Sequence, residues 1–343
     1  MIILTSNIII TKKGGFMKKK LATIIIVLII LIICVEVLRE SKSIMRTVTF
    51  SLNIWQSNIF PSLFPFFVIS ELLINCGFAS FLGEILKKVM NKVFKLKGES
   101  SFALVLSMLS GFPSGSKYTK ELYIKGLIND QEATKLLTFT HFSNPVFILG
   151  TISIMFLNNK EIGFLILVCH YIGSFIVGIL FRNYYISPNN NIKISFKKAV
   201  DAMHQKRVAN KMNFGQMITQ ALMNSINTLF LILGVITMFL IITTIIDNNI
   251  NLNLYNQSIL NGIFEMTQGL KYTSLLNIPL KNKAILATLF ISFGGLSVHM
   301  QTISIISDTK IKYYPFLIAR ILHASISSLL IYILFEYYFL WLS

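Results

Sequence analysis

Glycine, serine, proline and lysine residues form one short cluster in an apolar part of the chain. The stretch reads SGFPSGSK, from Ser110 to Lys117, and apolar segments flank it on both sides. Glycine and proline interrupt regular helices, while hydroxyl and ammonium groups bind polar partners. An interrupted helix also exposes backbone amides, which suit a carboxylate or another polar group. The cluster therefore predicts a binding site for a polar solute.

Three other apolar segments contain comparable interruptions. They read FSNPVF around Asn144, FEMTQG around Glu265 and FGGLSV around Gly295. We expect the interruptions to supply the binding site together, because each combines polar side chains with a broken backbone. The candidate site residues are Ser110, Gly111, Pro113, Ser114, Gly115, Lys117, Asn144, Pro145, Glu265, Thr267, Gln268, Gly294, Gly295, Ser297 and Gln301.

A search of the sequence for catalytic motifs does not favour an enzyme. Ser114 and Lys117 match the S-x-x-K spacing of acyl-enzyme serines, but the S-D-N and K-T-G partners are missing, so the match is read as coincidence. The chain has neither a phosphate-binding P-loop nor an H-E-x-x-H helix. Its three cysteines are far apart and form no metal-ligand pattern. We expect no enzyme and no cofactor, with a coupling ion, Na⁺ or H⁺, as one energy source for uphill transport.

Composition identifies the elements that must position these residues. The chain has 343 residues, of which 54% are hydrophobic and only 13% are charged. Apolar runs at 21–38 and 225–246 approach or exceed the ~20 residues that cross a bilayer core. The sequence therefore predicts an all-α polytopic membrane protein, with the lipid bilayer as its surroundings.

The net charge of +17 is interpreted as a topology signal and not as a nucleic-acid surface. Basic residues gather in the connections, at 17–20 and 196–211, whereas 247–257 has none. Cytoplasmic loops carry an excess of lysine and arginine. We therefore place the first two segments on the cytoplasmic side and the third on the opposite side.

The order of segments predicts an internal repeat. Each half contains a span, a re-entrant hairpin and a broken span, and the span at 162–181 reverses the direction of the second half, so the repeats are inverted. Broken backbone at membrane depth must be buried in protein or line a cavity, so the four interruptions should meet at one site. The predicted divisions are 1–16 (a candidate non-native extension), 17–53 (anchor helix and connection), 54–160 (first repeat), 161–212 (connecting span and basic loop) and 213–343 (second repeat and final span).

The interruptions also carry a family resemblance. NIFPSLFPFFVISELL, SGFPSGSK, LLTFTHFSNPVFILG, FEMTQG and FGGLSVHMQ resemble, in this order, the sporulation integral membrane proteins of the YlbJ or SpoVV family. The resemblance covers roughly residues 54–338. It implies a Gate, or nucleoside-recognition, domain and a layout similar to concentrative nucleoside transporters. It further implies transport of dipicolinic acid from the mother cell toward the forespore, across the outer forespore membrane.

Several residues keep two interpretations. Glu265 either lines the site or is structural, and Glu71 either lines it or makes a structural hydrogen bond. Lys117 either pairs with an anionic solute or extends to the membrane interface. For a dianion, Lys117 and the helix N-termini would supply positive potential, and Glu265 would be protonated, bind a cation or hold Lys117. Arg320 either packs or contacts substrate.

Two alternatives to dipicolinate transport stay open. One is a transporter of nucleosides or similar small metabolites. The other is a non-transporting scaffold of a spore-assembly complex, which would not need polar residues at the four interruptions. The expected partners are accordingly a small anionic or nucleoside-like solute, further copies of the chain or other spore proteins. His141 and His299 flank two interruptions and are candidate proton carriers, whereas the other histidines are expected to be structural or solvated.

Overall fold

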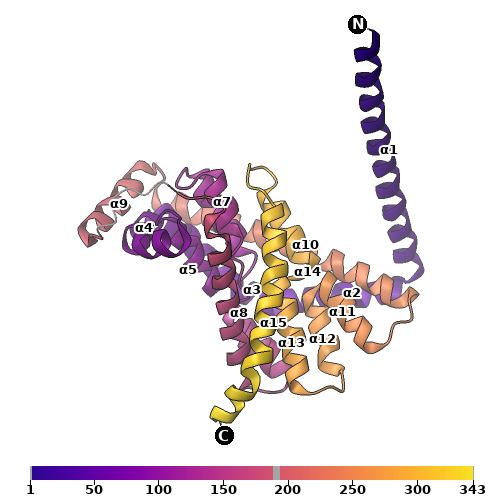
Figure 1. Ribbon diagram of the computed structural model, residues 1–343. Helices are drawn as coiled ribbons and strands as arrows, with labels where there is room; N and C mark the ends of the chain where they lie inside the picture. The colour runs from indigo at the N-terminus through magenta and orange to yellow at the C-terminus, as the bar shows by residue number, and fades with distance from the viewer. Residues whose placement is uncertain (1, 188–193, 343) are drawn as a thin grey trace.

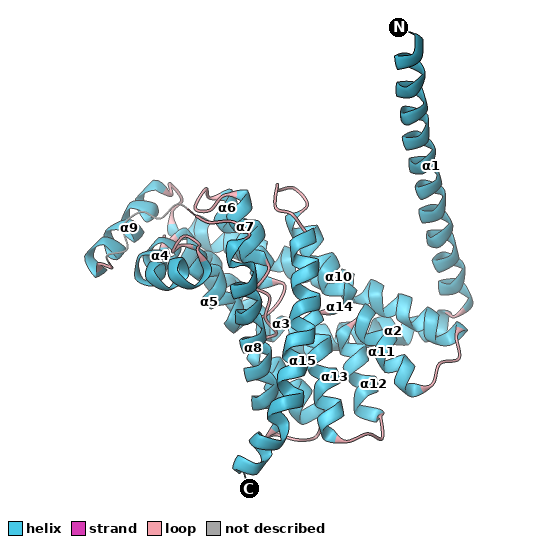
Figure 2. Cartoon of the chain, in the orientation of Figure 1, coloured by secondary structure: helices cyan, strands magenta, loops and turns pink. Residues whose placement is uncertain are grey.

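The computed structural model describes residues 2–187 and 194–342, and every regular element in these ranges is a helix (Figures 1 and 2). Five helical stretches are long and apolar enough to cross a membrane. They are Ser41–Asn75, Ile162–Asn183, Phe214–Asn249, Leu280–Ile306 and Tyr314–Trp341. The predicted class, an all-helical polytopic membrane protein, is confirmed.

The helices before the middle of the chain include three π-helical turns, named η1 to η3. In order they are α1 (Ile2–Arg39), α2 (Ser41–Ile54), η1 (Trp55–Ile59), α3 (Phe60–Asn75), α4 (Phe78–Val89), η2 (Met90–Phe94), α5 (Ser100–Ser110), α6 (Ser114–Ile124), α7 (Asp130–Leu137) and η3 (Phe147–Phe156). The later ones are α8 (Ile162–Leu180), the 3₁₀ turn η4 (Phe181–Asn183), α9 (Phe196–Ala209), α10 (Phe214–Asn249), α11 (Leu254–Phe264), α12 (Met266–Leu275), α13 (Leu280–Phe293), α14 (Gly295–Ile306) and α15 (Tyr314–Leu342).

Helix α1 extends away from the rest of the molecule (Figure 1). Its apolar side chains are exposed along the expected anchor, for example Leu21 at 58%, Ile29 at 50% and Leu38 at 74%. Such a surface suits lipid and not water. The predicted division at 17–53 stays a prediction. The separate status of residues 1–16 stays a prediction, and Met1 lies outside the described residues.

The second span begins earlier than the sequence suggests. The apolar segment at 53–81 predicts a span with Pro61 and Pro65 near its start, whereas α2, η1 and α3 form one stretch from Ser41 to Asn75. Pro61 lies in the first turn of α3, directly after the π-helical turn η1, and Pro65 lies inside α3. The prolines mark a local change of helix type, and a π-helical turn is a recognised way to accommodate an interrupted hydrogen-bond ladder.

Long helices pack against each other in antiparallel pairs. The α2–α3 stretch packs against α10, with Thr47 bonded to Thr244 at its start and Glu71 to Asn224 at its end. Helices α8 and α15 also lie side by side in opposite directions (Figure 1), since His323 bonds to the carbonyl of His170 and Tyr338 to that of Glu161. Helix α8 belongs to the predicted connecting span and not to the first repeat. The inverted relation of the two halves and the re-entrant path of the hairpins stay predictions.

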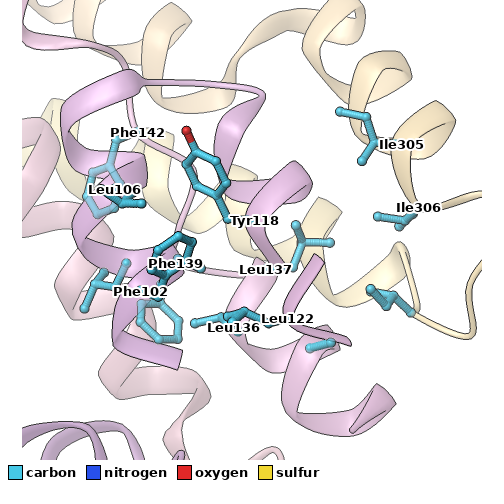
Figure 3. Packing of buried hydrophobic residues seen from close by; sticks show 14 of the residues in the cluster. Phe102, Leu106, Tyr118, Leu122, Leu136, Leu137, Phe139, Phe142, Ile305 and Ile306 are labelled. Carbon is cyan, nitrogen blue, oxygen red and sulfur yellow. The ribbon is translucent and has the colours of Figure 1, made fainter. Parts of the chain in front are cut away.

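Each apolar core combines helices of both halves. One core contains aromatic and leucine side chains of α5, α6 and the segment after α7, and Ile305 and Ile306 of α14 pack at its edge (Figure 3). The other core joins η3 and α8 to α12, α13 and α15. Because neither core belongs to one half alone, the interruptions of both halves are held in one packed unit.

The fold generates a topology prediction. The basic segment that contains α9 precedes α10, and the segment without basic residues follows α10. The two segments therefore lie at opposite ends of one apolar helix. In a cysteine-free background, Lys197→Cys should react with a membrane-impermeant maleimide only from the cytoplasmic side. Asn251→Cys should react only from the other side. Labelling of both cysteines from the same face would contradict the predicted topology.

Candidate functional site: a cavity at four helix interruptions

Residues from all four interruptions line one cavity of about 60 Å³. Phe112 comes from the first hairpin, Asn144 from the first broken span, Glu265 from the second hairpin and Gln301 from the helix after the second break. The π-helical turn η1, the start of α3 and the middle of α10 complete the wall. The full lining is Ile54, Asn58, Ile59, Ser62, Leu63, Phe112, Ser143, Asn144, Phe147, Ile232, Ile236, Glu265, Met266, Thr267, Val298 and Gln301.

Glycines let the interruptions of each half touch. Gly111 has φ +80°, and a Cβ on it would lie 2.5 Å from the Cβ of Asn144. Gly295 has φ +68° and lies against the backbone of Phe264 and Met266, with a Cβ at 3.2 Å from each. Only glycine adopts these dihedrals readily while allowing so close an approach. In each half, the break of the hairpin therefore contacts the break of the neighbouring span.

The first broken span contains a non-helical stretch at 138–144 whose backbone is satisfied by buried side chains. Arg320 donates to the carbonyl of Thr138 at 2.7 Å and to that of His141 at 3.0 Å. His170 accepts from the amide of Ser143 at 2.9 Å, and the Ser174 hydroxyl donates to the carbonyl of Phe139. These side chains replace the hydrogen bonds that water would supply elsewhere, as membrane depth demands.

Arg320 is thus a packing residue of the scaffold. It is 1% exposed and also contacts the Nδ1 atom of His323 at 2.9 Å. His323 in turn donates to the carbonyl of His170, and the other ring nitrogen of His170 bonds to Ser292. Arg320, His323, His170 and Ser292 therefore form a series of hydrogen bonds that connects α8, α13 and α15. His141 differs, because it stacks on Phe112 and neither ring nitrogen has a hydrogen-bond partner.

Glu265 is the acidic side chain of the cavity wall. It caps α12 by accepting from the amide of Gln268 at 3.0 Å and from the hydroxyl of Thr267 at 3.2 Å. Lys117 does not lie beside it, because the Lys117 ammonium lies 3.6 Å from Glu71. The interpretation in which Glu265 holds Lys117 is therefore wrong for this arrangement. No lysine or arginine occurs among the described residues of the cavity lining.

The candidate residues divide into three groups by position. Four line the cavity, namely Asn144, Glu265, Thr267 and Gln301. Four form the breaks beside it, namely Ser110, Gly111, Gly294 and Gly295, and Ser110 accepts a 3.4 Å hydrogen bond from Asn144. The others do not belong to the lining and are Pro113, Ser114, Gly115, Lys117, Pro145, Gln268 and Ser297. Ser114 contacts Ser110 at 2.8 Å and bonds to the carbonyl of Gly111, so it stabilises the turn.

Sequence reasoning missed three polar residues of the wall: Asn58, Ser62 and Ser143. Asn58 and Ser62 lie on a continuous helical stretch, so no interruption marked them. An amide and a hydroxyl four positions apart in an apolar run share one helix face, and that spacing was the available signal. No group of three or more metal-ligating side chains occurs in the part of the chain that was described.

These features define a class: a polytopic helical membrane protein with broken helices around a central cavity that has polar side chains in a mainly apolar wall. The family model for Gate, described as nucleoside recognition, matches residues 57–160. The chain is 32% identical over 309 residues to the sporulation integral membrane protein YlbJ of Bacillus subtilis (strain 168), covering 83% of this chain and 76% of that protein. The chain therefore belongs to the YlbJ family of sporulation integral membrane proteins. No solved structure matches it.

The role of Arg320 generates a stability prediction. Arg320→Met should leave the carbonyls of Thr138 and His141 without their donor inside the protein. We expect a loss on the order of 3 kcal/mol, since a buried carbonyl without a partner costs about 1–3 kcal/mol. Thermal unfolding of the detergent-solubilised protein measures it. Arg46→Met, at an exposed position of α2, is the control, and equal unfolding temperatures of the two variants would exclude the scaffold role.

Proposed function

We propose that the chain is a transporter of a small polar anion in sporulating cells, with dipicolinic acid as its solute. The observation that carries this proposal is the meeting of four helix interruptions at one cavity whose mainly apolar wall contains several polar side chains. A scaffold would not need the asparagine, serine, threonine, glutamate and glutamine side chains that face this cavity. Broken helices that meet at membrane depth are typical of solute sites in secondary transporters.

The size of the cavity supports alternating access. At about 60 Å³ the cavity is far below the 300–1,000 Å³ of typical ligand pockets. A dicarboxylate or a nucleoside would therefore enter only after the surrounding helices separate. The central cavity is too small for either solute in this structure, and we propose that movement of the surrounding helices widens it.

The charge of the wall constrains the solute. A bare dianion is costly to desolvate, and Glu265 would repel it. Dipicolinate would therefore enter together with a proton or a cation that neutralises Glu265. Helix N-termini at the interruptions supply amides for the solute, and the carbonyl ends of the preceding helices supply oxygens for a cation.

The relative's name motivates the cellular setting. YlbJ is named a sporulation integral membrane protein. We place this chain in the outer forespore membrane and infer net movement from mother cell to forespore. The alternative solute is a nucleoside or similar metabolite, which the match to the nucleoside-recognition family favours.

Uptake into vesicles containing the purified protein tests these proposals directly. Labelled dipicolinate should accumulate above the level of protein-free vesicles, and labelled nucleosides should not. Uptake of nucleosides without uptake of dipicolinate would show that the solute is a nucleoside and not dipicolinic acid. Failure of both, with correctly inserted protein, would favour the scaffold.

Gln301 and Glu265 generate the prediction on solute chemistry. Gln301→Leu keeps the size of a cavity-lining side chain and removes its hydrogen bonds, so uptake at low dipicolinate should fall by about tenfold, the equivalent of ~1.4 kcal/mol. Glu265→Gln should change the pH or ion dependence of uptake more than the solute affinity. The controls are Gln131→Leu and Glu161→Gln, both at exposed positions. Wild-type uptake by Gln301→Leu would remove Gln301 from the site.

A further inference from the structure

A second, larger cavity of about 510 Å³ lies between the end of α3 and the basic loop. Its wall includes Glu71 and Asn75 of α3, Glu121 and Lys125 of α6, and Asn224 of α10. Lys206 of α9 and Asn210 lie on the side of the basic loop. By the positive-inside rule this cavity faces the cytoplasm. None of the interruption residues lines it.

Three charged side chains form a buried cluster at this wall. The ammonium of Lys117 lies 3.6 Å from Oε2 of Glu71 and 4.0 Å from Oε1 of Glu121. Glu71 is 4% exposed and Lys117 is 6% exposed. Lys117 also lies 4.7 Å over the ring of Phe67, and Asn224 donates to Oε1 of Glu71 at 3.0 Å. The cluster is therefore packed in place by α3, α6 and α10.

The cluster has unused hydrogen-bonding capacity. Oε2 of Glu71, Oε2 of Glu121 and the Lys117 ammonium are buried and have no hydrogen-bond partner. The neighbouring Lys125 forms no ion pair with either carboxylate and donates instead to Asn75 at 2.5 Å, so it offsets the excess charge only from a longer distance. Two carboxylates beside one ammonium leave one negative charge in excess, and an uncompensated buried charge is strongly unfavourable.

We propose that Glu71 and Glu121 together bind one proton, which enters from the cytoplasmic cavity. The proton forms an O–H bond with one carboxylate oxygen, and the resulting carboxyl donates to the other carboxylate. The pair then carries one negative charge, which the Lys117 ammonium balances. Lys117 occupies the place that a metal cation would need, so the geometry favours a proton as the ligand.

The charged and titratable groups around the pair are Lys117, Tyr118 and Lys125 of α6 and Lys206 of α9. Helix α10 contributes Asn224 and Gln220, and α4 contributes Ala79 and Ser80, to the same wall. Lys117 is therefore the cation within ion-pair distance of both carboxylates among the described residues.

Helix α6 connects this site to the central cavity. It begins at Ser114, directly after the first interruption, and carries Lys117 and Glu121 on its next turns. Ser116 of the same helix contacts Thr302 of α14 at 3.1 Å. Loss of the proton would leave excess charge against α6 and favour its movement. This coupling role rests on the proposed transport function, whereas proton binding itself does not.

Infrared spectroscopy of the reconstituted protein tests the proton directly. Wild-type protein at neutral pH should show a protonated-carboxyl band that Glu71→Gln and Glu121→Gln each lose, because either variant leaves one carboxylate facing one ammonium. Glu84→Gln, which removes a carboxylate that pairs with Lys87 on α4, should keep the band. Size-exclusion chromatography checks that each variant is folded. If one of the two glutamine variants does not fold, the other still gives the test.

Two results would overturn the proposal. One is a band that both glutamine variants retain. The other is a band in wild type that disappears when Na⁺ is added at constant pH, which would assign the site to a metal cation. For the coupling role, Glu121→Gln should lose the stimulation of dipicolinate uptake by an imposed pH gradient. If wild type transports no dipicolinate, the proposed function fails while the infrared result still decides the proton site.

Discussion

The structure depends on satisfying the backbone of helices that are broken inside the protein. Residues 138–144 interrupt the helix, and hydrocarbon would offer no partners to the backbone groups that are left without helical hydrogen bonds. Arg320 donates to two carbonyls of this stretch and His170 accepts from one of its amides. These side chains come from α15 and α8, which pack against each other. The buried Arg320 and His170 therefore have a structural role. Because they bond to the backbone of the break, side chains at the breaks can face the cavity.

Two cavities of different size follow from this arrangement. The central cavity is small and is lined by residues from all four interruptions, whereas the second cavity is larger and lies beside the basic loop. Helix α6 begins at the first interruption, beside the central cavity, and carries Glu121 in the wall of the larger cavity. A rigid helix placed in this way can transmit a change of charge at the larger cavity as a displacement at the first interruption, provided that it has two discrete positions.

The sequence predicted what depends on local composition. Apolar length predicted the spans, and glycine, proline and asparagine in apolar runs predicted the four breaks and their meeting point. It could not predict the partner of Lys117, because Glu71 lies on another helix and helix register depends on packing. It also missed Asn58, whose helix continues without interruption. Composition therefore predicted the cavity, whereas long-range contacts decided which polar residues reach it.

The position of Glu265 determines where an anion fits. Its carboxylate already accepts from the first-turn amide of α12 and from Thr267, so this N-terminus is used by the protein itself. The side chain of Asn144 accepts from the amide of Phe147 and so uses the start of η3 in the same way. Helix α14 has no side-chain cap, and the buried hydroxyl of Ser297 in its first turn has no partner. Val298 and Gln301 of the same helix line the cavity. The N-terminus of α14 is therefore the one open to the proposed anionic solute. Because Gly295 at this end packs against the backbone of Phe264 and Met266, the anion would bind close to Glu265, so a cation or proton would have to neutralise the glutamate.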